Sequence, residues 1–384
     1  MTATLREQFL LRRDITFLNH GSYGACPRTV FETYQAWQRD LESQPADFLG
    51  RRVRGLLAEA RASLASYLGA GTDDLVFFPN VTHALNVAAR SLPLRTGDEV
   101  LTTDHEYGAL DRTWRYFCTK AGAEYVRVEL PLPLDDPSRV VDAIWSRVTD
   151  RTRVLFLSHV TSATAVVLPI RPLIERSRAR GIWSVIDGAH APGQIDLDLD
   201  ALGADFYGGN CHKWLCAPKG AGFLHVRRAV QHLAEPLVVS WGWQPVDPGP
   251  SPFVDTQERQ GTMDPAAYLS VPAAIEFQRD NRWPAVRDAC HERAARARRE
   301  IERLADDATP VCADDPLWYR QMTTVPLPAC DIGLVKRRLY DEFAIEVPVL
   351  RWRDRPWIRV SIQAYNDDRD VDRLVAGLTH VLRQ

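Results

Sequence analysis

The sequence lacks a long apolar run. No stretch of its 384 residues reaches the roughly 18 consecutive apolar residues that a membrane span needs. The first residues, MTATLREQFLLRRD, place Glu, Arg and Asp among their apolar residues, so they lack the apolar core of a signal peptide. We therefore expect a soluble globular protein that neither spans a membrane nor carries a secretion signal.

The sequence also lacks a regular spacing of cysteines and an excess of either charge. The seven cysteines are odd in number, scattered and never spaced as CxxC, which argues against a zinc knuckle or a disulfide framework. We expect no metal site and a reducing, cytoplasmic location. With 47 Lys and Arg against 50 Asp and Glu, the formal charge of −3 leaves no basic field to gather nucleic acid. The expected partner is a small molecule.

What the sequence does contain is an alternation of short apolar β-rich runs with helical stretches, from about residue 75 to residue 240. The candidate strands are 75–78, 99–103, 124–130, 153–159, 183–187, 205–209 and 220–226, and the candidate helices are 81–92, 108–121, 138–148 and 172–180. This alternation predicts βαβ units and a largely parallel sheet. In a chain of 384 residues with 45% hydrophobic residues, we expect one large domain and a smaller one.

The last third of the chain differs in pattern. Residues 244–258 are rich in Pro, Asp and Gly, which predicts a long surface loop. The charged run 287–307 has Ala, Arg and Glu in helical proportion and predicts a solvated helix between the domains. Apolar runs follow around 322–327, 343–350 and 357–362, with a helix over 331–342. They predict a small α+β domain.

Two polar residues in the stretch 185–226 are the main candidates for an active site. Asp187 ends an apolar strand, and ligands bind at the carboxyl ends of strands in an open α/β sheet. Lys213 lies among His, Trp, Leu, Cys and Ala, where partial desolvation would lower its pKa and free its amine for imine formation. Taken alone, Asp187 is also compatible with a turn or cap residue, and Lys213 with a snorkelling lysine.

These two segments resemble a known family. DGAHAPG (187–193) and GGNCHKW (208–214) resemble the fold-type I, class V aminotransferases, a family that includes cysteine desulfurases, selenocysteine lyases and kynureninases, and within it the isopenicillin-N epimerase-like branch. Further matches are NHGSYGACP (19–27), PADFLGRR (45–52), PNVTHALN (79–86), SHVTSATAVVLP (158–169), SWGW (240–243), GTMDPAAYLSVPAAIEF (261–277) and IRVSIQAYN (358–366). The resemblance therefore covers nearly the whole chain.

The resemblance implies an α/β, aspartate-aminotransferase-like fold. Its large domain has a mostly parallel central sheet and binds pyridoxal 5′-phosphate (PLP), and its carboxyl-terminal domain is a smaller α+β unit. The implied boundaries are 1–20 for an amino-terminal segment over the active site, 21–270 for the large domain and 271–384 for the small domain.

The resemblance also implies the residues that hold the cofactor. Lys213 forms the Schiff base, Asp187 contacts the pyridine nitrogen and His190 donates to the phenolate oxygen. Val81 and Thr82 begin a helix whose N–H groups and hydroxyl bind the phosphate, a site that the helix dipole favours.

Further phosphate donors are implied at Asn210 and His212. Thr262 matches a residue that reaches the phosphate of the neighbouring subunit, which implies a homodimer with shared active sites. Tyr107 falls where cysteine desulfurases place a histidine against the cofactor ring, and its phenol adds a possible proton donor. His105, two residues earlier, is the competing candidate for that position.

On the substrate side, Arg359 matches the small-domain arginine that pairs with the substrate carboxylate, for which a planar guanidinium is suited. Asn19 and His20 lie where the amino-terminal segment folds over the substrate. Arg51 is a candidate for the distal part of a substrate, or else a helix-surface charge.

Other nucleophiles and bases are weaker candidates. His83 and His159 lie near the predicted cofactor site, but each is equally compatible with a structural histidine. Cys211 and Cys216 flank the cofactor lysine and are interpreted as packing residues. Cysteine desulfurases carry a nucleophilic cysteine shortly before the carboxylate-binding arginine, and residues 343–357 contain none, which disfavours that activity.

The implied reaction takes place at the α-carbon of an amino acid or of a substrate that contains one. Lys213 can remove or return the α-proton as a general base, a step that racemisation, transamination and β-elimination share. The first hypothesis is an isopenicillin-N epimerase-like epimerase or racemase. The second is a C–S β-lyase for cysteine conjugates or sulfoxides, ahead of an aminotransferase. A non-catalytic binding subunit is the third, which the complete set of candidate residues disfavours.

Overall fold

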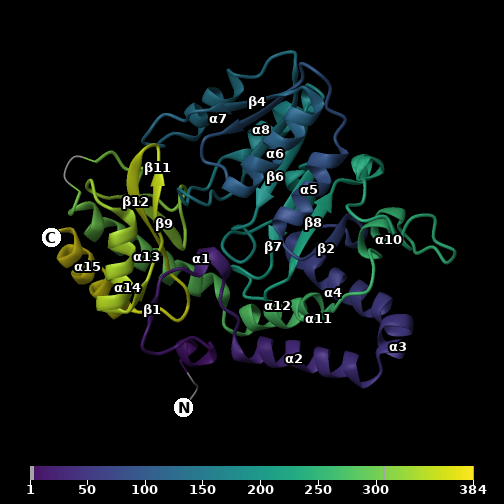
Figure 1. The fold of residues 1–384 in the computed structure, drawn as a ribbon, viewed down its shortest axis with the longest axis horizontal. Helices are drawn as coiled ribbons and strands as arrows, with labels where there is room; N and C mark the ends of the chain where they lie inside the picture. The colour runs from purple at the N-terminus through teal and green to yellow at the C-terminus, as the bar shows by residue number, and fades with distance from the viewer. Residues whose placement is uncertain (1–3, 306–307, 384) are drawn as a thin grey trace.

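A seven-stranded sheet forms the centre of the larger part of the molecule (Figure 1). The structure is a computed structural model and describes residues 4–305 and 308–383. The strands are β2 (Leu75–Phe78), β3 (Glu99–Thr103), β4 (Glu124–Val128), β5 (Thr152–Ser158), β6 (Trp183–Gly188), β7 (Phe206–Asn210) and β8 (Gly222–Val226). Their order is β2-β8-β7-β6-β5-β3-β4, and only β8 runs against its neighbours. The predicted α/β fold with a mostly parallel sheet is confirmed.

Helices follow the strands as the alternation predicts. They are α5 (Val81–Ser91), α6 (Gly108–Ala121), α7 (Pro137–Trp145), α8 (Ile170–Ala179) and α9 (Leu199–Leu202). The helix α5 buries Val81, Leu85 and Ala88 on one face, the spacing that its sequence shows. Because α5 starts directly after β2, its amino terminus lies at the edge of the sheet where the parallel strands end.

Helices before and after these units complete the larger part. They are α1 (His20–Tyr23), α2 (Arg28–Ser43), α3 (Pro45–Asp47), a π-helical turn over Phe48–Arg52, α4 (Val53–Leu68), α10 (Pro252–Glu258), α11 (Ala266–Leu269) and α12 (Val271–Asp280), with 3-10 turns at Leu5–Gln8, Thr72–Asp74 and Arg228–Leu233. No helix within residues 4–305 and 308–383 is long and apolar enough to cross a membrane.

The loop predicted over 244–258 is wrong in its second half, where α10 forms. Ser251 caps this helix by accepting the Val254 N–H, and Pro252 occupies the first helical position, where its missing N–H costs nothing. Phe253 and Val254 then pack into an apolar cluster beneath the sheet edge strand β2. The predicted loop is therefore confined to the residues that precede α10.

The solvated helix predicted over 287–307 is also corrected. The helix α13 runs from Trp283 to Glu302, and residues 306–307 of the predicted range lie outside the described residues. One face of α13 is buried, with Cys290, Ala294 and Ile301 in the core of the smaller part. Small alanines among the charges allow that face to approach β9 and β12 closely.

The smaller part has its own sheet and core. Its antiparallel sheet has the order β11-β12-β9, from β9 (Met322–Pro326), β11 (Val349–Trp352) and β12 (Arg355–Ser361), and α13, α14 (Ile332–Phe343) and α15 (Asp368–Leu382) pack around it. The strand β1 (Thr16–Phe17) pairs with β10 (Ile345–Glu346), which fixes the amino-terminal segment to the smaller part (Figure 1). The domain boundaries at residues 20 and 270 stay a prediction.

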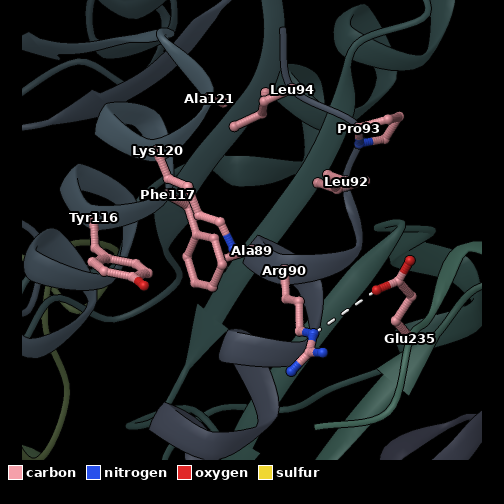
Figure 2. Close-up of a pocket in the computed structure, with 10 residues that line it drawn as sticks. All are labelled: Ala89, Arg90, Leu92, Pro93, Leu94, Tyr116, Phe117, Lys120, Ala121 and Glu235. Carbon is pink, nitrogen blue, oxygen red and sulfur yellow. Dashed lines mark ion pairs between the residues drawn. The ribbon is translucent and has the colours of Figure 1, made fainter.

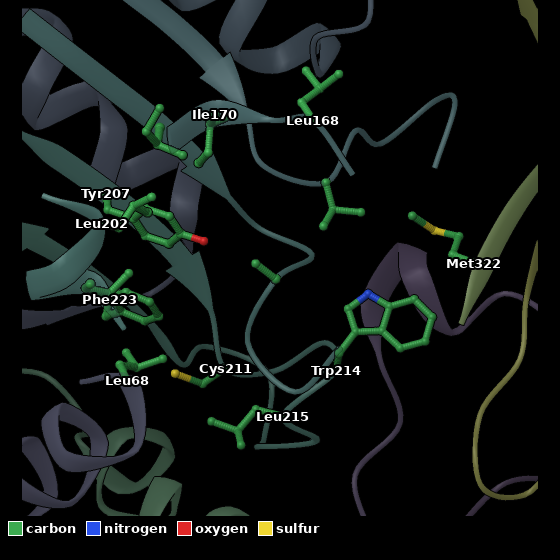
Figure 3. Close-up of a cluster of buried hydrophobic side chains, with 14 of the residues drawn as sticks. Leu68, Leu168, Ile170, Leu202, Tyr207, Cys211, Trp214, Leu215, Phe223 and Met322 are labelled. Atoms are coloured by element: carbon green, nitrogen blue, oxygen red, sulfur yellow. The ribbon is translucent and has the colours of Figure 1, made fainter. Parts of the chain in front are cut away.

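An apolar cluster joins the two parts beside the predicted cofactor lysine. Figure 3 shows Trp214, from the turn after β7, and Met322, from β9. Gly21 of α1 lies between them, because an added Cβ there would meet Met322 Sδ at 2.7 Å and Trp214 at 3.5 Å. The amino-terminal segment therefore packs directly on the turn that carries Lys213.

Candidate active site

The carboxyl ends of β5, β6 and β7 bring the predicted site residues to one edge of the sheet. Asp187 lies near the end of β6, directly beside Ser158 at the end of β5. Asn210 ends β7, and the turn that follows carries Lys213. This is the edge at which an open α/β sheet binds its ligands.

Lys213 is half-buried at the floor of this site. Its Nζ lies 3.2 Å from Nε2 of His190. Burial lowers the pKa of Lys213, and the positive charge of Arg359 acts in the same direction, whereas Asp187 opposes it. The amine is therefore far easier to deprotonate than a surface lysine, as nucleophilic attack on an aldehyde requires.

Asp187 is the acidic counterpart of that lysine. It is 2% exposed, and its Oδ1 accepts the Ala189 N–H at 2.8 Å. Burial raises the pKa of Asp187, while the Ala189 hydrogen bond and Lys213 lower it. A buried carboxylate is costly without a cation, so a cationic ring nitrogen placed against Asp187 would be stabilised there.

The predicted phosphate end lies at the start of α5. Asn80 caps the helix by accepting the His83 N–H, and the side chain of Asn210 accepts the Val81 N–H at 2.9 Å. His212 donates from Nδ1 to the Ala221 carbonyl at 2.9 Å. Since the Val81 N–H is already bonded, Thr82 is the better placed of the two helix residues to bind an anion. The phosphate-binding roles stay predictions.

Arg359 is held at the opposite end of the site by two serines. Its Nη1 donates to the Ser162 carbonyl at 2.6 Å and its Nη2 to Ser22 Oγ at 2.9 Å. The guanidinium is 6% exposed, burial lowers its pKa to about 10, and its Nε has no partner among the described residues. A buried, incompletely paired guanidinium is a ready site for a carboxylate.

The amino-terminal residues hold this end in place. Ser22 Oγ donates to Asn19 Oδ1 at 2.5 Å, and Asn19 Nδ2 donates to Glu346 at 3.0 Å. The ring of His20 lies 3.0 Å from the Lys213 carbonyl through Nε2 and 3.0 Å from the Tyr365 hydroxyl through Nδ1. His20 thus fixes the backbone of the lysine turn, and direct substrate contact by Asn19 or His20 stays a prediction.

The structure separates the two candidates for the ring-facing position. His105 is fully buried, with Nδ1 2.7 Å from Thr164 Oγ1 and its ring 4.7 Å from that of Trp352. Tyr107, the residue before α6, is 42% exposed and lies close enough to Arg359 to raise the pKa of that guanidinium. The geometry therefore favours Tyr107.

Two predicted residues are not brought to the floor of the site. Arg51 belongs to the exposed side of the π-helical turn and pairs with Asp47 at 3.2 Å. Thr262 is exposed in the segment before α11, as a residue that serves a second subunit would be. Their roles stay predictions.

The weaker candidates have structural surroundings. The exposed His83 lies 3.1 Å from Asn80 Oδ1, and His159 lies 3.0 Å from the Tyr207 hydroxyl. Cys211 and Cys216 are buried free thiols, and burial raises the pKa of each thiol. Both cysteines therefore pack as uncharged groups rather than serve as nucleophiles.

Sequence reasoning missed Glu106, which the fold buries beside Asp187. Its carboxylate accepts hydrogen bonds from Ser158 N at 2.8 Å, Ser158 Oγ at 2.6 Å and Thr103 Oγ1 at 2.7 Å. Burial and, to a smaller extent, the charge of Asp187 raise the pKa of Glu106 to about 8, although its hydrogen bonds to Ser158 and Thr103 act in the opposite direction. A single Glu in the run DHEYGAL gives no signal of burial, because Ser158, which donates two of its three hydrogen bonds, lies 52 residues away on β5.

A hollow of about 570 Å³ lies away from this site (Figure 2). Its lining comes from the carboxyl-terminal ends of α5 and α6, with Arg90 paired to Glu235 at 3.8 Å. The candidate active site uses the opposite, amino-terminal ends of the same helices. The hollow is therefore not part of that site.

Comparison with known proteins agrees with this arrangement. A profile described as aminotransferase class V matches residues 24–374. The chain belongs to the class V aminotransferase family. Isopenicillin N epimerase from Amycolatopsis lactamdurans is 41% identical over 391 residues, covering 98% of this chain and 97% of that protein. The enzyme of the same name from Streptomyces clavuligerus is 37% identical, covering 97% of this chain and 96% of that protein.

More distant relatives carry other names. A probable chloroplastic L-cysteine desulfhydrase from Arabidopsis thaliana is 28% identical over 96% of this class V chain and 83% of its own length. Among solved structures, a cysteine desulfurase from Escherichia coli has a TM-score of 0.82 at 21% identity, covering 98% of this chain and 97% of its own. A cystine C–S lyase has a TM-score of 0.81 at 20% identity, covering 95% and 97%. The predicted family and fold are confirmed.

The residues of this class V chain fit pyridoxal 5′-phosphate. The amine of Lys213 is buried and easily deprotonated, Asp187 offers a buried carboxylate to a ring nitrogen, and the start of α5 favours an anion. Arg359, across the site, is left for a substrate carboxylate.

Proposed function

We propose that this chain is a PLP-dependent epimerase or racemase that acts at the α-carbon of an amino acid or of a substrate that contains one. The observation that carries the proposal is the full-length identity of 41% and 37% to two isopenicillin N epimerases, against 28% to a cysteine desulfhydrase. PLP, once bound, supplies the electron sink that makes the α-proton removable.

The residues of the floor have separate tasks in this reaction. Lys213 Nζ removes and returns the α-proton, and its lowered pKa leaves a working fraction of free amine at neutral pH. Asp187 holds negative charge at the ring nitrogen. Arg359, fixed by Ser22 and Ser162, orients the substrate through its carboxylate.

Inversion of configuration by a two-base mechanism needs a second proton-transfer group on the other face of the α-carbon. Tyr107 is the candidate, because it carries an ionisable hydrogen, is 42% exposed and lies near Arg359. Lys213 would then exchange a proton on one face and Tyr107 on the other.

A C–S β-lyase is the second candidate function. It is supported by the relatives that are named cysteine desulfhydrases. Elimination needs only one base, Lys213, since the leaving group departs from the β-carbon. A desulfurase is disfavoured, because residues 343–357, which precede Arg359, contain no cysteine that could act as its nucleophile.

We also propose a cytoplasmic homodimer in which Thr262 completes the phosphate site of the other subunit. The exposure of Thr262 supports this, and the seven free cysteines suit a reducing compartment. Sedimentation of the active enzyme tests the assembly. A fully active monomer, or unchanged PLP affinity in Thr262→Ala, would contradict the shared site.

The function is tested by a screen of amino acids, isopenicillin N and cysteine conjugates that follows chirality and pyruvate release together. Loss or inversion of chirality at the α-carbon without pyruvate is expected. Pyruvate as the main product would replace the proposal with the lyase, and neither product from any substrate would contradict both.

A further inference from the structure

A tryptophan next to the cofactor lysine donates its indole hydrogen to His190. Trp214 Nε1 lies 3.1 Å from His190 Nδ1, and the other ring nitrogen of His190, Nε2, lies 3.2 Å from Lys213 Nζ. Trp214 is 0% exposed and His190 is 1% exposed. The three side chains form a single buried line from the indole to the amine.

We infer that Trp214 is a positioning residue that holds His190 in one tautomer, with its hydrogen on Nε2 and facing Lys213. The reason is the chemistry of the three groups. An indole nitrogen can only donate, so His190 Nδ1 must accept and cannot carry a hydrogen. In the neutral ring the hydrogen is then on Nε2, and the uncharged amine of Lys213 can accept it, whereas an ammonium could not.

Glutamine side chains hold the backbones of His190 and Trp214 in place. The His190 carbonyl accepts Gln194 Nε2 at 2.8 Å, and the Trp214 carbonyl accepts Gln278 Nε2 at 2.8 Å. The indole also lies 4.9 Å from the ring of His20. With both backbones fixed, neither ring can turn away without leaving a buried polar atom unpaired.

The charges around His190 favour the same neutral state. Burial lowers the pKa of His190 well below its usual range, and the nearby Lys213, Arg359, His20 and His212 lower it further. The described surroundings therefore disfavour a second hydrogen on the ring. The Nε2–H is left to serve an acceptor beside Lys213, which is where the cofactor binds in the proposed function.

The first test uses wild-type, cofactor-free protein and does not depend on the proposed function. Selective ¹⁵N labelling of the ten histidines, with the His190 signals identified by their loss in His190→Gln, reports which ring nitrogen is protonated. We expect a hydrogen on Nε2, none on Nδ1, and no titration of the ring in the usual histidine range, because burial lowers the pKa of His190 well below it. A hydrogen on Nδ1 would overturn the inference.

The second test uses Trp214→Phe, which keeps an aromatic ring but removes the donor. Without the indole donor, His190 loses its tautomer preference and donates a weaker hydrogen bond to the bound cofactor. The deprotonated, more negatively charged form of the cofactor is then less stabilised. We expect the pKa seen in the absorbance of the Lys213-bound cofactor to rise by about one unit, the size of one hydrogen bond to a charged group. An unchanged absorbance titration in a folded variant would overturn the inference.

Trp283→Phe is the matched control. Trp283 is also buried, and its indole donates to the Gly193 carbonyl at 3.1 Å rather than to a histidine. The Trp283→Phe variant loses the same volume and one hydrogen bond but keeps the hydrogen bond from Trp214 to His190. Its absorbance titration should therefore match that of the wild type. An equal shift in Trp283→Phe would mean that lost packing, not the His190 tautomer, is responsible. If Trp214→Phe does not fold, the wild-type ¹⁵N measurement still decides.

Discussion

The floor of the site and its rim differ in burial and in hydrogen bonding. The floor consists of Asp187, His190 and Trp214, which are buried, and the half-buried Lys213; all four lie at the edge of a sheet and are bonded to one another or to the main chain. The rim consists of Tyr107, Arg51 and Thr262, which are exposed and lie, respectively, just before α6, in the π-helical turn and in the segment before α11. From this difference we predict that the proton step common to the family depends on the floor, whereas the choice of reaction depends on the rim.

Burial explains why the floor is rigid. An unpaired polar group costs about 1–3 kcal/mol when it is buried, so each floor side chain has few alternatives to its observed partners. The exposed rim side chains can reorient in water at little cost and take their final place only against a substrate or a second chain. Changes in the floor should therefore affect every reaction that the site could carry out, and changes in the rim should affect one reaction more than another.

Lys213→Ala should have the largest effect, because it removes both the covalent attachment of PLP and the general base. Turnover should be lost, and the absorbance of the lysine-bound cofactor should disappear. Borohydride reduction followed by peptide mapping identifies the modified lysine. Lys219→Ala, six residues further on at an exposed position, is the control and should retain both. A label on any lysine other than Lys213 would contradict the assignment.

Tyr107→Phe should come next and should separate the two regions. Losing one acid–base group should slow racemisation of both enantiomers by about 10²–10⁴-fold. PLP binding should persist, since the ring remains and the floor is untouched. Racemisation is measured by circular dichroism or chiral chromatography. A wild-type rate would show that another residue serves the second face.

Asp187→Asn should slow turnover by about 10²–10³-fold, the range for a lost electrostatic contact in a buried site. The amide keeps the shape of the carboxylate but not its charge at the ring nitrogen. Turnover is compared with thermal unfolding, which checks that the variant is folded. Near-normal turnover would show that the electron sink does not depend on this carboxylate.

Arg359→Lys should have the smallest effect of the four and should act on KM. An ammonium cannot bond a carboxylate with two parallel N–H groups, and a lost charged hydrogen bond of about 1.5–3 kcal/mol corresponds to about 10–100-fold in KM. Arg355→Lys, at the exposed start of the same strand, is the control. An equal loss in both variants, or a loss confined to kcat, would argue against carboxylate binding by Arg359.

Parts of the floor could be predicted from the sequence because strand ends are local features. Asp187 and Lys213 each follow an apolar strand, and parallel order places such ends together. The pairs that position them could not be predicted in this way. Ser22 reaches Arg359 across 337 residues, and Trp214 reaches His190 across 24, so neither contact follows from local spacing.

The choice between His105 and Tyr107 shows the same limit. The two residues are two positions apart on the segment that leaves β3, and both can carry out proton transfer. Packing distinguishes them: the ring of Trp352, from the smaller part, and the hydroxyl of Thr164 hold His105 inward, whereas Tyr107 is exposed. Neither partner is near in sequence.

The division between floor and rim is tested most directly by Tyr107→Phe in deuterated water, with α-proton exchange and racemisation followed in the same sample. The account predicts that exchange at the face served by Lys213 stays near the wild-type rate, while racemisation falls by about 10²–10⁴-fold. If exchange and racemisation fall together, or if neither falls, Tyr107 does not act separately from the floor and the account is contradicted.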